Sequence, residues 1–321
     1  MKKLLPILSS LISIGLTPSV FAHQSCGLYA CNKQAGHPYL GLTGFYVKPS
    51  ETGVGQVSDS WQYAINGSTA FSKPFNPSHD VEGEIILGYN LPCSADNIEA
   101  RYFHLDNHTH ALNEPTDATS FGSVFFNLSV PGPTFVSDAN LVYKLDQVDL
   151  KFGRTYREGS GKFSFKPTVG LRYAKLDHQL LFLIGKVKSH FSGFGPIFGV
   201  DSSYNLWKCF NFVGNFEYSP IVGKINSGSQ LRFSTNEIFT SPKLDRIVHN
   251  VKGNLGLNYR YTFCNESTAT IEGGYQVGEY INAMDLILAQ SGALGAGQKI
   301  NDIATNSFSY RGPYVNVTVA L

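Results

Sequence analysis

The sequence predicts an all-β fold, a transmembrane antiparallel β-barrel of about 10 strands (10–12) with short periplasmic turns and long extracellular loops. Three observations favour it: the composition, a period-two alternation of apolar and polar residues, and connections that alternate in length. The chain has 32 Gly, 23 Phe and 17 Tyr but only 15% charged residues, which favours strands over helices. No run of about eighteen apolar residues follows the N-terminal region, so we expect no membrane-spanning helix.

Apolar and polar residues alternate over long stretches, and residues 251–263 are the clearest example. Val251 and Leu255 share one face of this stretch, and Lys252 and Asn254 share the other. A soluble sandwich would bury the apolar face in a core, whereas a membrane barrel turns it toward lipid and turns the polar face toward a wet lumen. Segments of about eleven residues or more, with aromatic residues at their ends, favour the membrane barrel.

Ten segments carry this alternation, and an even number of strands returns both chain ends to the periplasmic side. We place them at 38–47, 81–91, 98–105, 139–154, 163–176, 191–208, 210–222, 247–263, 269–281 and 307–321. The alternation slips between Leu145 and Val148, and we expect a β-bulge there. Short connections lie at 93–96, 157–161, 208–210 and 264–267, and long ones at 49–80, 106–138, 224–245 and 282–306.

The first residues predict an exported chain. Residues 1–22 have a basic start, an apolar run and a small-residue cleavage site, as a signal peptide does. Residues 23–37 then form a periplasmic N-terminal segment with a Cys pair, and residues 38–321 form the outer-membrane barrel. We therefore expect the protein in the bacterial outer membrane, inserted by the outer-membrane assembly machinery and surrounded by outer-membrane lipid and lipopolysaccharide.

The cysteines indicate an oxidising compartment, and their odd number leaves at least one unpaired or joined to another chain. Three lie at short connections and two lie near the start of the mature chain, so we expect all of them on the periplasmic side. The disulfide candidates are Cys26, Cys31, Cys93, Cys209 and Cys264. Links between neighbouring barrels, which give a disulfide-linked oligomer, fit this placement better than an internally stapled core.

Several short stretches resemble the Legionella major outer membrane protein family. They are GYNLPC at 88–93, VDLKFG at 148–153, GFGPIFGVD at 193–201 and GPY at 312–314. The resemblance covers most of the mature chain but not the long loops. It implies an outer-membrane barrel that acts as a porin and forms disulfide-linked assemblies through its cysteines. No family motif identifies a catalytic or ligand-binding residue.

Two groups of His and acidic residues were weighed for chemistry. His104, Asp106, His108 and His110 share one face of an extended strand, as transition-metal ligands do, but a solvated loop explains them better. Some outer-membrane barrels are proteases with Asp and His at the outer rim, but the spacing here matches none of them, so we expect no enzyme, no cofactor and no metal. The residues weighed for catalysis are Asp106, His108, Asp177, His178, Asp245 and His249.

Charge on the polar faces of the strands is the feature most relevant to transport. The lumen-facing candidates are Glu82, Glu84, Glu99, Arg101, Lys166, Arg172, Glu217, Arg260 and Glu272. Their mixed signs allow either an aqueous pathway with weak ion selectivity or a plug of ion pairs across a narrow lumen.

We expect passive passage of small solutes and surface contact through the long loops, with a host surface or serum protein as a partner. The alternative is a non-conducting structural or adhesive barrel whose extracellular loops bind a host or envelope partner. The formal net charge of +1 gives no reason to expect a nucleic-acid partner.

Overall fold

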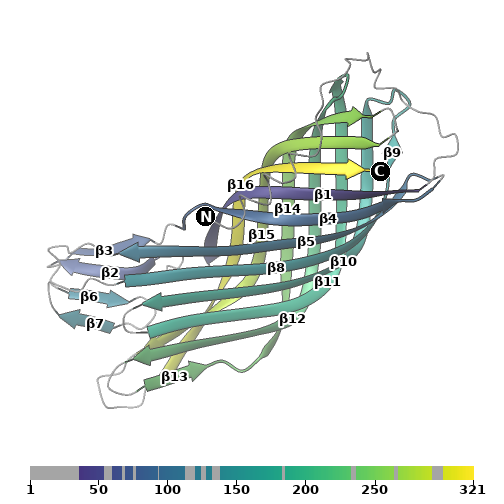
Figure 1. Ribbon diagram of the computed structural model, residues 1–321. Helices are drawn as coiled ribbons and strands as arrows, with labels where there is room; N and C mark the ends of the chain where they lie inside the picture. Colours follow the sequence, from purple (N-terminus) through teal and green to yellow (C-terminus); the bar gives the residue numbers. More distant parts are fainter. Residues whose placement is uncertain are drawn as a thin grey trace.

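Ten long antiparallel strands close into a barrel, which confirms the predicted fold (Figure 1). The computed structural model describes residues 36–53, 60–66, 69–74, 77–92, 94–112, 120–123, 128–131, 138–182, 185–232, 236–263, 267–290 and 299–321. The barrel strands are β1 (His37–Gly53), β4 (Asp80–Asn90), β5 (Asp96–Leu112), β8 (Asp138–Arg154), β10 (Phe163–Phe182), β11 (Gly185–Trp207), β12 (Phe210–Arg232), β14 (Leu244–Thr262), β15 (Thr268–Gln290) and β16 (Lys299–Ala320). Each strand pairs with the next in this order, and β1 pairs with β16 to close the ring. Within the described residues, no helix is long and apolar enough to cross a membrane.

The shorter strands belong to the connections. β9 (Tyr156–Arg157) pairs with the start of β10 at the end of the barrel that carries the short turns. At the opposite end, β2 (Ser60–Asn66), β3 (Thr69–Pro74), β6 (Ser120–Ser123) and β7 (Leu128–Pro131) form a separate four-stranded sheet in the order β3-β2-β6-β7 (Figure 1). β13 (Asn236–Thr240) pairs with the end of β12. The four-stranded sheet therefore joins two different connections, the one between β1 and β4 and the one between β5 and β8.

The barrel strands are longer than a membrane requires. A tilted strand crosses the hydrocarbon region with about 9–11 residues, whereas β11, β12 and β15 have 23 residues each. The additional residues lie at the end away from the short turns, where the sequence predicts loops. The expected loops at 106–138 and 224–245 are thus wrong in part, because β5 continues to Leu112 and β12 to Arg232.

The sequence predicts loops at these strand ends because the apolar face of each strand changes sides where the strand leaves the membrane. In β8, Val148 and Leu150 point outward and are about half exposed, whereas Leu141 and Leu145 point inward and are buried. Throughout β8 the register with both neighbouring strands is continuous, so the predicted bulge is wrong. The slip in the sequence marks a change of solvent, since the outer face meets lipid below this point and water above it.

The same inversion recurs around the ring and defines a lipid-facing band. The outward apolar side chains of β1, β5, β10 and β12 end at Tyr46, Tyr102, Tyr173 and Val222, all of them exposed. Beyond these residues the outer face becomes polar and the apolar side chains turn inward. The barrel therefore has a membrane half with a polar interior and an extracellular half with an apolar interior.

One strand bends into the barrel mouth. The register of β15 with β16 shifts between Tyr280 and Met284, and Asn282 inside the shift adopts a φ of 61°. Beyond it, the backbone N–H of Asp285 donates to Oγ of Ser189 on β11 at 3.0 Å. Because β11 is not a neighbour of β15 in the ring, this contact crosses the interior.

Candidate functional site

The membrane half of the lumen holds a network of charged and polar side chains. We call it the lumen network, and its members are Glu84, Glu99, Arg101, Asp149, Lys151, Arg172, Glu217, Asn250 and Lys252. All of them point inward, and the residues next to them along each strand point outward into the lipid-facing band. Arg101 is partly exposed, and the other members are buried. Period-two geometry explains this placement, because residues two apart on a strand point to the same side.

Arg172 of β10 is the centre of the lumen network. Its Nε and Nη2 donate to the two carboxylate oxygens of Asp149 on β8 at 2.8 and 2.7 Å. Nη2 also donates to Oε2 of Glu217 on β12 at 2.7 Å, and Nη1 donates to Oδ1 of Asn250 on β14. Since β11 and β12 separate β10 from β14 in the ring, the guanidinium group connects strands across the lumen. The side chains of Arg172, Asp149 and Glu217 are 0% exposed, so no water-sized path passes beside them.

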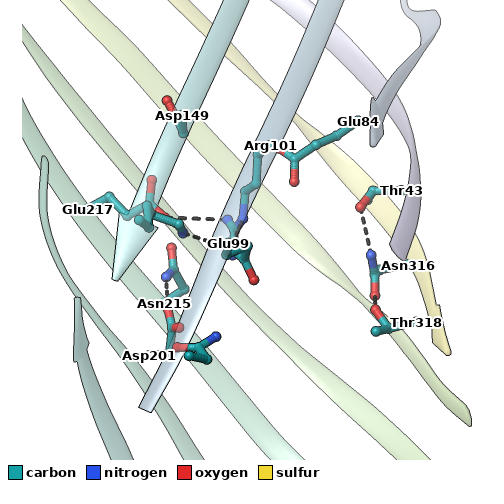
Figure 2. Close-up of polar contacts among 12 residues, drawn as sticks. Thr43, Glu84, Glu99, Arg101, Asp149, Asp201, Asn215, Glu217, Asn316 and Thr318 are labelled. Carbon is teal, nitrogen blue, oxygen red and sulfur yellow. Dashed lines mark hydrogen bonds and ion pairs between the residues drawn. The ribbon is translucent and has the colours of Figure 1, made fainter. Parts of the chain in front are cut away.

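Glu217 receives two further cations from the opposite wall. Nζ of Lys151 lies 2.8 Å and Nη1 of Arg101 lies 3.4 Å from Oε1 of Glu217. Arg101 also pairs with Glu99 on its own strand, and Figure 2 shows it between Glu99 and Glu217. Because a buried carboxylate is stable only with charged or hydrogen-bonded partners, these contacts hold β5, β8 and β12 together.

Two more contacts span the lumen at other points of the ring. Nζ of Lys252 on β14 lies 3.2 Å from Oε2 of Glu84 on β4. The hydroxyl of Tyr280 on β15 donates to Oε1 of Gln147 on β8 at 2.5 Å. β8 and β15 lie on opposite sides of the ring of strands. The interior of the membrane half is therefore bridged in several directions.

An apolar layer fills the lumen above this network. Phe103 stacks on Tyr310 with ring centroids 5.4 Å apart, and Tyr143 lies 5.3 Å from Phe308. The four rings come from β5, β8 and β16, and each is at most 1% exposed. Leu105, Leu145, Leu176 and Phe191 belong to the same cluster. Such packing excludes water by volume and by the low affinity of apolar surface for water.

A third contact crosses the extracellular half. Oε1 of Glu51 on β1 lies 2.9 Å from Nε2 of His178 on β10 and accepts a hydrogen bond from the hydroxyl of Tyr143 on β8. Burial raises the pKa of Glu51, but His178 and the hydrogen bonds from Tyr143 and Asn306 outweigh burial and hold the pKa below its usual value. The carboxylate is thus kept ionised in the interior.

The structure brings together only part of the charged set chosen from the sequence. Glu84, Glu99, Arg101, Arg172 and Glu217 lie in the lumen network. Glu82 is buried nearby and accepts a hydrogen bond from the backbone N–H of Asp106 at 3.1 Å. The other three candidates are not members of the network. Lys166 pairs with Asp201 at 2.8 Å, and this pair borders Glu99 and Arg101. Glu272 accepts a hydrogen bond from Tyr314 at 2.7 Å, and Arg260 is exposed near the periplasmic end of β14.

Sequence reasoning missed four members of the lumen network, Asp149, Lys151, Asn250 and Lys252. Asp149 and Lys151 alternate with Val148, Leu150 and Phe152, and this signal marks them as inward-facing. The expected bulge next to them obscured which face they occupy. Lys252 stood on the polar face of the clearest alternating stretch but was not selected.

The His and Asp residues weighed for chemistry do not meet at one site. His104, Asp106, His108 and His110 share the outer face of β5, where Nδ1 of His104 lies 2.8 Å from Asp146 and Nε2 of His108 lies 2.9 Å from Asp106. Across the part of the chain that the structure describes, no group of three or more His, Cys, Asp or Glu residues is arranged to hold a metal ion.

The remaining acid–histidine candidates are divided by the barrel wall. Asp177 points outward and contacts His190, whereas the next residue, His178, points inward. His249 accepts or donates a hydrogen bond with the hydroxyl of Tyr218 at 2.7 Å, and Asp245 is exposed on β14. Neighbouring residues of a strand face opposite sides, so sequence proximity separates these groups instead of joining them.

The cysteines are only partly visible. Cys209 lies in the short turn between β11 and β12 and is disulfide-bonded. The other four cysteines lie outside the described residues, so the connectivity and any link between chains stay predictions. Residues 1–35, which contain the expected signal peptide and the Cys26–Cys31 pair, also lie outside them.

Comparison with known proteins gives one clear match. A family model described as the Legionella pneumophila major outer membrane protein precursor matches residues 31–321. No curated protein matches the chain.

Solved outer-membrane barrels are similar at a distance. The outer membrane protease OmpT from Escherichia coli is 10% identical with a TM-score of 0.48, and the match covers 91% of this chain and 99% of OmpT. The Pseudomonas putida toluene transporter TodX is 10% identical with a TM-score of 0.34, over 88% and 89% of the two chains. A Pseudomonas aeruginosa FadL homologue is 7% identical with a TM-score of 0.28, over 89% and 90%. These similarities are too remote to assign an activity.

Proposed function

Because the chain belongs to the Legionella major outer membrane protein family and is a bacterial outer-membrane β-barrel, we propose that it acts at the cell surface as a closed barrel. Its extracellular half and its connections make contact with partners, and its lumen is plugged by side chains. This proposal corresponds to the non-conducting barrel given above as the alternative function. It includes no catalytic role, because His178 faces the interior whereas its neighbour Asp177 faces outward.

The observation that carries the proposal is the bridging of the lumen by Arg172. Its guanidinium group binds side chains from three other strands, and its side chain is 0% exposed. The apolar layer of the extracellular half lies above it. A hydrated solute would have to displace both layers, and barrels of about ten strands leave little room beside the side chains that fill them.

Passive passage of small solutes is the second candidate function. The polar character of the lumen network supports it, since paired charges can exchange partners with water and ions more readily than an apolar core can. Passage would then require a rearrangement that breaks the bonds of Arg172 and separates the stacked rings of Phe103 and Tyr310.

Planar-bilayer recording distinguishes the two candidates. We expect refolded wild-type protein to give no reproducible single-channel steps. The open-barrel control is a variant that truncates side chains of both layers: Arg172→Ala, Glu217→Ala, Phe103→Ala and Tyr310→Ala. Its folding is checked by the shift in gel mobility on heating. Regular steps from the wild-type protein would refute the closed barrel and support the porin.

Surface contact is supported by the small sheet at the extracellular end. β2 and β3 come from one connection and β6 and β7 from another, so the sheet ties two connections into one unit (Figure 1). Cells that carry a chain without residues 60–74 and 120–131, which form the small sheet, should retain the barrel but lose adhesion to host cells or capture of serum protein. Unchanged adhesion by these cells would contradict a contact role for this sheet.

A further inference from the structure

A group of lysines lies on the outer face of β10, β11 and β12, just beyond the lipid-facing band. The band ends at Tyr173 on β10, Phe194 on β11 and Val222 on β12. Lys175 follows two residues after Tyr173, and Lys224 follows two residues after Val222, so both leave the wall on the outer side. This height is where the head groups of the outer leaflet meet the barrel.

The strand register arranges the group in rows. Lys175 is paired in register with Ser192, and Ser192 is paired with Lys224. Further out, Asp177, His190 and Asn226 form the next row, and Gln179, Lys188 and Gly228 form the row after it. Lys186 lies two residues beyond Lys188. We call the set Lys175, Lys186, Lys188, His190 and Lys224 the basic face.

On its own strands β10, β11 and β12, the basic face has four lysines and one aspartate. Asp177 is the carboxylate within it, at 3.1 Å from Nζ of Lys175 and 2.5 Å from Nδ1 of His190. Asp146 and Asp245 border it, paired in register with Lys175 and Lys224. Lys188 and Lys224 are exposed, and the small residue Ser192 lies between Lys175 and Lys224.

The outer face on the neighbouring strands differs. On β5 and β8, at the same height, Lys144 pairs with Asp106 at 3.0 Å and His104 pairs with Asp146 at 2.8 Å. There each basic group has an acidic partner. Lysines are therefore more numerous on this outer face of β10, β11 and β12 than on that of β5 and β8.

We propose that the basic face binds the phosphate groups of an outer-leaflet glycolipid, lipopolysaccharide. The acyl chains lie along the lipid-facing band below Tyr173, Phe194 and Val222, and the phosphorylated head group lies at the lysines. Each lysine ammonium group binds phosphate as a point charge, and the binding is stronger when several lysines share one phosphate ligand.

The test is a binding titration of the refolded mature chain in uncharged detergent with lipid A and with dephosphorylated lipid A, read by native mass spectrometry. Wild-type protein should prefer the phosphorylated lipid. Lys175→Gln with Lys188→Gln and Lys224→Gln should weaken lipid A binding roughly tenfold to a hundredfold and leave the dephosphorylated lipid unaffected. These side chains are on the surface, and the shift in gel mobility on heating confirms folding.

A matched control removes the same charge away from the basic face through Lys48→Gln on β1 and Lys162→Gln and Lys208→Gln at the short turns. This control should bind lipid A as the wild-type protein does. Equal losses in both triple variants would overturn the proposal, because they would indicate a general effect of net charge. Displacement of lipid A by millimolar inorganic phosphate would also overturn it, since it would mean that the site takes free phosphate and not a lipid head group.

Discussion

Arg172→Met tests the lumen network most directly, because it removes the cation and keeps much of the side-chain volume. Glu217 would retain Lys151 at 2.8 Å and Arg101 at 3.4 Å. Asp149 would keep only the hydrogen bond from Nε2 of Gln147 at 2.8 Å among the bonds described above. The unpaired charge therefore falls on Asp149, and leaving a buried charge without its partner costs about 3–5 kcal/mol.

The assay is equilibrium unfolding in urea of the barrel refolded in lipid vesicles, followed by tryptophan fluorescence. We expect Arg172→Met to lower the free energy of unfolding by about 3–5 kcal/mol. Adding Asp149→Asn removes the unpaired charge and should restore all but about 1–2 kcal/mol of it. This recovery separates an electrostatic loss from a simple loss of packing.

Lys144→Met is the control for the same kind of ion pair on the surface. Lys144 lies 3.0 Å from Asp106, and the two side chains are 46% and 33% exposed. Solvent screens such a pair, so the expected loss is about 0–1 kcal/mol. The reasoning fails if Arg172→Met costs no more than Lys144→Met, or if Asp149→Asn gives no recovery in the Arg172→Met background.

Three further predictions concern the extracellular half and the turns. The folded-state pKa of Glu51 is depressed by His178, so its contribution to stability is present above the ordinary carboxyl pKa and is lost as the pH falls through the folded-state value. The difference in unfolding free energy between wild type and Glu51→Gln should therefore shrink on acidification, and a constant difference from pH 7 to pH 3 would contradict it. In intact cells, His108→Cys should react with an impermeant maleimide and Val148→Cys should not; the reverse pattern would contradict the position of the lipid-facing band. Because Cys209 is disulfide-bonded, Cys209→Ser should add one reactive thiol to the denatured, unreduced chain, and an unchanged thiol count would contradict that bond.

The sequence predicted the membrane half of the barrel well. Residues such as Val148 and Leu150 face lipid and alternate with inward polar residues, so the pattern in the chain and the pattern in space are the same. The ten strands and their order follow from that pattern and from the spacing of the turns. The outer ends of the strands were underestimated, because there the apolar residues change to the inner face and the outer face carries charge.

The chain by itself determined that this protein is a ten-stranded barrel with a charged inner face, since period-two alternation and turn spacing are local properties. Tertiary structure decided whether those charges line water or bind one another. Arg172 and Asn250 are 78 residues apart and meet only because the ring closes. The basic face arises from the register of three neighbouring strands. The first depends on distances across the barrel and the second on strand pairing, and no local pattern in the sequence contains either.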